Sequence, residues 1–155
     1  MSKIKAGMKV PEFSLSMTGG GKWKLKDAAG RKLVIYFYPR DMTSGCTRES
    51  QDFRDLTAAF RKAGTDIVGI SRDSLASHEK FAAREALRFP LLADTEEQVC
   101  KLFDVIKEKS LYGRKYLGVE RSTFLLDGAG RLQQEWRKVK VLGHAEEVLE
   151  AAQRL

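Results

Sequence analysis

The pattern of apolar and polar positions predicts strands and helices in alternation along this chain. From Phe13 to residue 17, apolar and polar side chains alternate, as in a strand with one buried face. A glycine-rich turn at 18–21 separates this stretch from residues 22–25, which alternate again, so the two predict an N-terminal β-hairpin. Residues 32–38 show no polar alternation after the first position, which indicates a strand buried on both faces.

A helix and a second buried strand are predicted after this first core strand. The helix is indicated by apolar residues at helical spacing, namely Phe53, Leu56, Phe60 and Ala63. Gly64 stands where such a helix would end. Residues 65–71 then have the pattern of a second strand that is buried on both faces.

The middle of the chain predicts two more helices around a short strand. One helix is expected to run from its N-cap Ser77 to residue 87. Residues 89–93 predict a strand, and Pro90 places it towards an edge of the sheet because proline cannot donate a ladder hydrogen bond. Asp94 or Thr95 is expected to cap the next helix. Its apolar residues are Val99, Cys100, Leu102 and Phe103.

The last third of the chain predicts a loop, a second hairpin and a final helix. Residues 107–118 have no clear period and predict a long surface loop. Residues 122–126 and 132–136 are predicted strands, and the Asp-Gly-Ala-Gly turn between them favours a hairpin. Residues 143–155 predict an amphipathic helix.

This order of elements predicts an α/β protein with a single domain over residues 1–155. Alternating strands and helices favour a mostly parallel central sheet flanked by helices, and the second hairpin adds an antiparallel edge. With the added N-terminal β-hairpin, this is the order that a thioredoxin-like fold requires. A reactive cysteine in that fold comes just after the first core strand, which is the position of Cys46.

The charge of the chain is positive, but its distribution does not indicate a nucleic-acid partner. The 155 residues include 28 Lys and Arg against 21 Asp and Glu, which gives a formal net charge of +7. The basic residues are spread along the chain without a run of five, and aromatic residues are not interleaved with them. We therefore expect a solvated surface, and no apolar run is long enough to predict a membrane partner.

The two cysteines, Cys46 and Cys100, indicate a reduced protein. A pair that lies 54 positions apart cannot form a disulfide framework. The first ten residues lack the apolar core of a signal peptide. The expected location is therefore the cytoplasm.

Cys46 is the candidate reactive group of this chain. It stands in the predicted first turn of a helix, where backbone N–H groups and a nearby cation can stabilise a thiolate. Gly45 lets the backbone approach closely before the cysteine. Thr43 offers a hydroxyl that can cap the helix or orient a small polar substrate beside the sulfur. These local features favour a reactive cysteine over a structural one.

The residues around Cys46 resemble those of the peroxiredoxins. Pro39, Thr43 and Cys46 match the signature Pro-x-x-x-Thr-x-x-Cys of that family. Their flanks resemble the peroxiredoxin Q type, also called bacterioferritin comigratory proteins. Residues 118–127 resemble the family's arginine-bearing strand, with Arg121 as the arginine. The likeness covers nearly the whole chain.

The resemblance implies a thioredoxin-fold peroxidase that reduces hydrogen peroxide and organic hydroperoxides without a metal or another cofactor. Cys46 would be the peroxidatic cysteine, which attacks as a thiolate and becomes a sulfenic acid. Thr43 would hydrogen-bond the peroxide, and Arg121 would stabilise both the thiolate and the charge on the leaving oxygen. Pro39 would shield the site from water and shape the loop.

Two departures from the family pattern matter. Ser44 stands where family members commonly carry proline, which predicts a looser loop with intact chemistry. The second cysteine with which peroxiredoxin Q proteins resolve the sulfenic acid is missing, because Gln51 and Ala82 occupy its two positions. The resemblance therefore implies a one-cysteine mechanism, with thioredoxin, glutaredoxin or glutathione as the reductant, and a monomer.

Cys100 is the only other cysteine and the alternative resolving group. It lies on the apolar side of its predicted helix, where a buried inert thiol is expected. A disulfide with Cys46 would need a large backbone movement, so a structural role is favoured over a resolving one.

Other classes of function are disfavoured. His78 and His144 are expected on the surface and away from Cys46, so neither a cysteine hydrolase nor a metal site is predicted. A disulfide oxidoreductase would need a Cys-x-x-Cys pair. The rival hypothesis is a non-enzymatic thioredoxin-fold binding module, which has no need of Thr43, Cys46 and Arg121 together.

Overall fold

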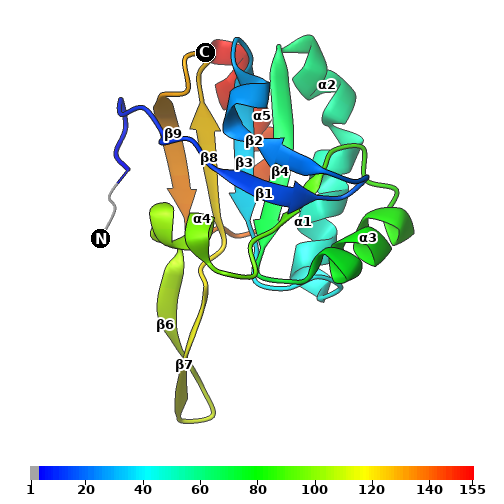
Figure 1. Ribbon diagram of the computed structural model, residues 1–155, viewed down its shortest axis with the longest axis vertical. Helices are drawn as coiled ribbons and strands as arrows, with labels where there is room; N and C mark the ends of the chain where they lie inside the picture. Colours follow the sequence, from blue (N-terminus) through cyan, green and yellow to red (C-terminus); the bar gives the residue numbers. More distant parts are fainter. Residues whose placement is uncertain (1–3) are drawn as a thin grey trace.

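A mixed sheet of seven strands forms the centre of the molecule (Figure 1). The computed structural model describes residues 4–155. The strands of this sheet are β1 Ser14–Met17, β2 Lys22–Lys24, β3 Lys32–Phe37, β4 Thr65–Ser71, β5 Leu91–Ala93, β8 Ser122–Leu126 and β9 Leu132–Arg137. Their order in space is β2-β1-β5-β4-β3-β8-β9, in which β5, β4 and β3 are parallel and the other pairings are antiparallel.

Helices and two hydrophobic cores cover the two faces of this sheet. The helices are η1 Leu25–Ala28, α1 Ser44–Asp55, α2 Thr57–Lys62, α3 Leu75–Arg84, α4 Gln98–Leu102 and α5 His144–Arg154. Val34 and Tyr36 of β3 belong to the core formed with α1, α2, α3 and α5. Leu33 and Ile35 belong to the other core, which contains residues of η1 and α4. Both faces of β3 are therefore apolar, as its sequence predicts.

The predicted thioredoxin-like α/β fold, with its N-terminal hairpin, is confirmed. The sheet is mixed rather than mostly parallel as predicted, because only β3–β4 and β4–β5 pair in parallel, while the hairpins at its two ends and the pairs β1–β5 and β3–β8 are antiparallel. The buried strands, the hairpin of β8 and β9 and the C-terminal helix are all present near their predicted positions. Gly64 follows α2 with a φ of 67°, in the left-handed region that favours glycine at a helix end. None of the helices within residues 4–155 has the length and apolar character that crossing a membrane requires.

The segment predicted as a surface loop at residues 107–118 is instead a two-stranded sheet. Strand β6 (Ile106–Leu111) pairs antiparallel with β7 (Arg114–Val119), and the ribbon projects from the body of the protein (Figure 1). Tyr112 and Gly113 both have positive φ, 51° and 78°, as a tight two-residue hairpin turn requires. Most of the ribbon is exposed, so neither of its faces requires apolar side chains. Its sequence therefore lacks the alternation of apolar and polar residues that identifies a strand.

Two predicted helix starts are wrong. Ser74 rather than Ser77 caps α3, and its hydroxyl accepts a hydrogen bond from the Ser77 N–H at 3.1 Å. The helix α4 begins after Glu97, and neither Asp94 nor Thr95 is its cap. Glu97 adopts a left-handed conformation with a φ of 60°, which delays the first helical turn.

Two further predictions of local structure are also corrected. The strand near Pro90 is not towards an edge, because β1 of the N-terminal hairpin pairs with the outer side of β5. Pro90 precedes β5, so its missing N–H removes no ladder bond of that strand. The helix predicted through residue 63 is divided at Leu56, whose ψ of 4° separates α1 from α2.

Candidate active site

Cys46 lies in the first turn of α1, as predicted. The loop after β3 ends at Thr43, which has the N-cap position of the helix, and Cys46 is the third helical residue. The cysteine is 1% exposed and belongs to the core on the α1 face of the sheet. A side chain at this position lies at the end of the helix where the first N–H groups have no partner within the helix and the dipole is positive.

Arg121 contacts the sulfur from a distant part of the chain. Its Nη2 donates a hydrogen bond to Cys46 Sγ at 3.4 Å. Strand β8 pairs with β3 so that Ser122 lies opposite Phe37, the last residue of β3. Because Arg121 directly precedes Ser122, this pairing brings its guanidinium to the loop that carries the cysteine.

Gly45 makes room for this contact. A Cβ at position 45 would lie 3.2 Å from Nη2 of Arg121, closer than side chains ordinarily approach. The close approach that the sequence predicts at Gly45 is therefore an approach by the arginine side chain.

Glu49 holds the other side of the guanidinium, and the sequence reasoning assigned it no role. Its Oε1 accepts a hydrogen bond from Arg121 Nη1 at 2.7 Å, and the Glu49 side chain is 1% exposed. Burial raises the pKa of Glu49 to about 7, although the charge of Arg121 acts to lower it. The spacing of three residues after Cys46 was the available signal, since such residues share one side of a helix.

The charge of Arg121 is stabilised by the groups that surround it. Burial lowers the pKa of this guanidinium, but the charges of Glu49 and Cys46 outweigh that effect and raise the pKa overall. The arginine is thus a fixed cation, held by a buried carboxyl on one side and directed at a thiol on the other.

Thr43 and Pro39 lie on the loop between β3 and α1. The Thr43 hydroxyl donates to the Arg40 carbonyl at 2.9 Å and makes no capping bond to the helix, so of its two expected roles the side-chain cap is not observed. The hydroxyl oxygen keeps its lone pairs, and Thr43 is exposed. Pro39 is partly buried and directly follows the buried Tyr38.

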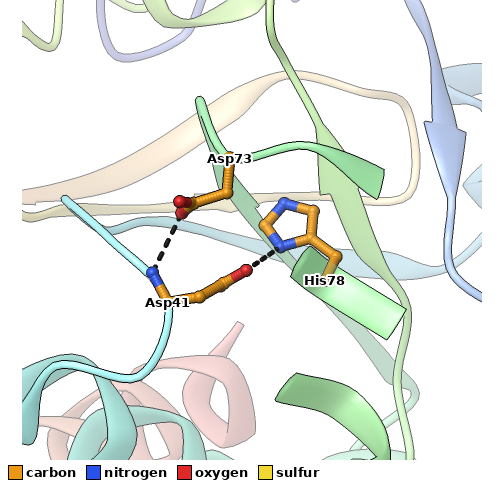
Figure 2. A group of neighbouring side chains, drawn as sticks. All are labelled: Asp41, Asp73 and His78. Carbon is orange, nitrogen blue, oxygen red and sulfur yellow. Dashed lines mark hydrogen bonds and ion pairs between the residues drawn. The ribbon is translucent and has the colours of Figure 1, made fainter. Parts of the chain in front are cut away.

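Asp41 ties this loop to α3 through a hydrogen-bond network (Figure 2). Its carboxylate accepts bonds from Tyr38 Oη at 2.6 Å, Ser77 Oγ at 2.8 Å and His78 Nδ1 at 2.7 Å. Its backbone N–H donates to Asp73 Oδ2 at 2.9 Å. Burial acts to raise the pKa of Asp41, but the hydrogen bonds from His78 and Tyr38 outweigh it and lower the pKa.

Both histidines are buried, so their predicted surface position is wrong. His78 is fully buried, and its Nε2 lies 3.0 Å from the Leu92 carbonyl, while its Nδ1 faces Asp41. His144 is 5% exposed and bonds Thr123 Oγ1 at 2.8 Å, and burial lowers its pKa to about 4. Histidine is tolerated in a core where its ring nitrogens find partners.

The group of Asp41, Asp73 and His78 has the residue types of a metal site, but its geometry fits hydrogen bonds better. Their ligand atoms lie within 4.8 Å of one another. However, Asp41 Oδ2 and His78 Nδ1 are 2.7 Å apart, whereas two ligands of a tetrahedral zinc ion are separated by about 3.3 Å. Asp73 Oδ2 already accepts a hydrogen bond from the Asp41 N–H, and Asp41 Oδ2 accepts one from Ser77 Oγ. These bonds hold the loop between β3 and α1.

Cys100 lies on the opposite face of the sheet from Cys46. It is fully buried in the core that contains residues of η1 and α4, whereas Cys46 belongs to the core of α1. Its backbone N–H donates to Asp94 Oδ2 at 2.7 Å, and burial raises the pKa of its thiol far above the usual range. The predicted buried, inert state of this cysteine matches its surroundings.

Comparisons with known proteins assign a family to this constellation. The AhpC/TSA family profile matches residues 6–135. Peroxiredoxin Bcp of Xanthomonas campestris pv. campestris is 54% identical over 140 residues, which cover 90% of this chain and 88% of the relative. Peroxiredoxin Bcp of Escherichia coli K12 is 40% identical over 149 residues, covering 96% of each chain.

Solved structures agree with this assignment. The structure of Xanthomonas campestris peroxiredoxin Q superposes with a TM-score of 0.88 at 53% identity, covering 92% of this chain and 90% of that chain. A mutant of Xylella fastidiosa PrxQ superposes with a TM-score of 0.93 at 39% identity, covering 99% and 98%. The chain therefore belongs to the AhpC/TSA family and, within it, to the peroxiredoxins of the Bcp, or peroxiredoxin Q, type.

Proposed function

We propose that this protein reduces hydrogen peroxide and organic hydroperoxides at Cys46. The thiolate attacks the terminal peroxide oxygen, the O–O bond breaks, and water or an alcohol leaves after taking up a proton. The sulfur loses two electrons and becomes a sulfenic acid. The observation that carries this proposal is the 3.4 Å contact between Arg121 Nη2 and Cys46 Sγ. An alkyl peroxide reduction activity is attributed to the Xanthomonas campestris bacterioferritin comigratory protein, whose structure superposes with a TM-score of 0.91.

The residues around the sulfur have distinct roles in this proposal. Arg121 stabilises the thiolate before the reaction and the charge that develops on the leaving oxygen during it. Thr43 has a free lone pair with which it accepts a hydrogen bond from the peroxide O–H. Pro39 shapes the loop and limits the access of water. No metal or other cofactor is needed, because the O–O bond is weak and sulfur takes the oxidation. The contact between thiol and arginine also disfavours the rival binding module.

The proposal includes a one-cysteine mechanism. An external thiol attacks the sulfenic sulfur of Cys46, forming a mixed disulfide and releasing water. The seven-stranded sheet separates Cys46 from Cys100, and disulfide formation needs Cα atoms within about 7 Å. Thioredoxin, glutaredoxin or glutathione in the cytoplasm can supply the external thiol, and the enzyme acts as a monomer.

Peroxide consumption with dithiothreitol tests the activity. We expect turnover by the wild type and by Cys100→Ser, and none by Cys46→Ser. Equal, negligible rates for wild type and Cys46→Ser would exclude the peroxidase. Mass spectrometry of the protein after one equivalent of peroxide tests the mechanism, and a dominant Cys46–Cys100 disulfide would refute the one-cysteine form.

A further inference from the structure

The β6–β7 hairpin, called the arm below, carries a concentration of exposed apolar side chains. Within residues 4–155, eight large apolar side chains are exposed, and four of them are on the arm. These four are Leu111, Tyr112, Tyr116 and Leu117. Tyr112 at the tip is 96% exposed. Because such residues are usually scattered singly, their grouping on a projecting ribbon (Figure 1) marks an interaction surface.

The register of the two strands sorts these residues onto two faces. Cross-strand partners share a face, so Lys109 lies beside Tyr116, and Leu111 beside Arg114. On the opposite face, Glu108 and Lys115 form an ion pair at 3.7 Å. The first face, called the basic face, combines apolar and positively charged side chains. It consists of Lys107, Lys109, Leu111, Arg114 and Tyr116.

The basic face is an ordered surface. A Cβ at Gly118 would lie 3.0 Å from Cδ of Lys109 and 3.2 Å from Cε2 of Tyr116, so both side chains lie close over this glycine. The Lys109 ammonium donates to the Val119 carbonyl at 2.6 Å, which fixes the lysine chain beside the tyrosine ring. An aromatic ring held in this way loses little conformational entropy when a partner binds.

The arm is joined directly to the candidate active site. Val119 ends β7, and Arg121, two residues later, contacts the sulfur of Cys46. The Lys109 ammonium bonds the Val119 carbonyl, two residues before Arg121. This cation therefore lies at the base of the arm, on the segment that leads to the site.

We propose that the basic face docks the protein thiol that reduces oxidised Cys46, a protein with acidic and apolar surface around its own cysteine. The inference rests on the proposed function, because it requires an external reductant. Charge complementarity favours an acidic protein. A second copy of this chain is disfavoured, since each copy carries a net charge of +7 and would bring the same cations to the contact. A small thiol needs no docking surface.

Docking precedes a balanced exchange of bonds. The partner's first thiol attacks the sulfur of the Cys46 sulfenic acid, an S–S bond forms, the S–O bond breaks, and water leaves with the thiol proton. The partner's second thiol then displaces Cys46 as a thiol and closes a disulfide in the partner. The arm affects only the binding of the partner protein that precedes the first of these two steps.

The test separates protein reductants from small ones. Cys46 is oxidised with one equivalent of hydrogen peroxide, and its reduction is then followed with reduced thioredoxin, with reduced glutaredoxin and with dithiothreitol. For Arg114→Glu, and for Leu111→Ser combined with Tyr116→Ser, we expect the rate with a protein reductant to fall about tenfold. The rates of oxidation by peroxide and of reduction by dithiothreitol should stay as in the wild type.

Leu142→Ser is the matched control, because Leu142 is 84% exposed and lies outside the arm. It should leave every rate unchanged. The inference is overturned if both arm variants are reduced by the two proteins as fast as the wild type, or if neither protein reduces the wild type faster than dithiothreitol does. It is also overturned if the arm variants lose only affinity for a single-stranded oligonucleotide. Failure of Cys46 to react with peroxide would instead refute the proposed function.

Discussion

Glu49→Gln should change how the stability of this protein depends on pH. The substitution replaces a buried carboxyl, 1% exposed, by an amide of the same shape whose oxygen can still accept the bond from Arg121. The wild-type carboxyl has a pKa of about 7 in the folded protein, against an ordinary value of 4.5. The folded state therefore holds the proton of Glu49 more tightly than the unfolded state does.

The sign and size of the effect follow from this difference in pKa. The stability that the protonated carboxyl contributes is fully present below pH 4.5 and is lost as the pH rises through about 7. The complete loss corresponds to about 3 kcal/mol. An amide does not titrate, so Glu49→Gln should gain stability relative to the wild type across this interval, and the gain should level off above it.

Urea unfolding at several pH values between about 5 and about 8 measures this, with both proteins in a Cys46→Ser background that prevents oxidation. The difference in unfolding free energy between Glu49→Gln and its parent should move by roughly 2–3 kcal/mol over the interval. The exposed Glu96 provides the matched control, since Glu96→Gln should show no such drift. A difference for Glu49→Gln that stays constant with pH would refute the reasoning.

Three further substitutions address the site and its supporting network. Gly45→Ala places a Cβ 3.2 Å from Nη2 of Arg121, so the stopped-flow rate of peroxide reduction should fall about tenfold, and an unchanged rate would contradict the proposed crowding. Arg121→Lys keeps the charge but loses the fork that joins sulfur and carboxyl, so the same rate should fall about 10²-fold. His78→Ala removes one of the buried hydrogen-bond partners of the Asp41 carboxylate and should cost about 3 kcal/mol in urea unfolding. Ser77→Ala removes one hydrogen bond from a neutral donor to the same carboxylate and should cost about 1 kcal/mol. Equal losses of unfolding free energy in the two variants would argue against the network.

The sequence alone determined the features that depend on neighbouring residues. The apolar runs at 32–38 and 65–71 predict the core strands, because strands buried on both faces need apolar side chains at every position. The turn before β9 and Gly64 mark element ends, because few residues adopt those backbone conformations. The position of Cys46 in the first turn of α1 follows from the same local signals.

Some local structure escaped prediction because its signals were weak or absent. The arm is exposed on most of its length, so its strands have no apolar period, and only the pairing of β6 with β7 defines them. The burial of His78 could not be predicted from the sequence, because its side chain is polar. Its place in the core depends on Asp41 and on the Leu92 carbonyl, which come from other parts of the chain.

Only the tertiary structure decided what surrounds the sulfur of Cys46. The pairing of β8 with β3 carries Arg121 to the thiol, and the first turns of α1 place Glu49 beside the guanidinium. The sheet also assigns Cys100 to the opposite core from Cys46. Contacts between residues 75 positions apart are set by strand register and sheet face. Local periodicity carries no information about either, because it records only which side of its own element a residue occupies.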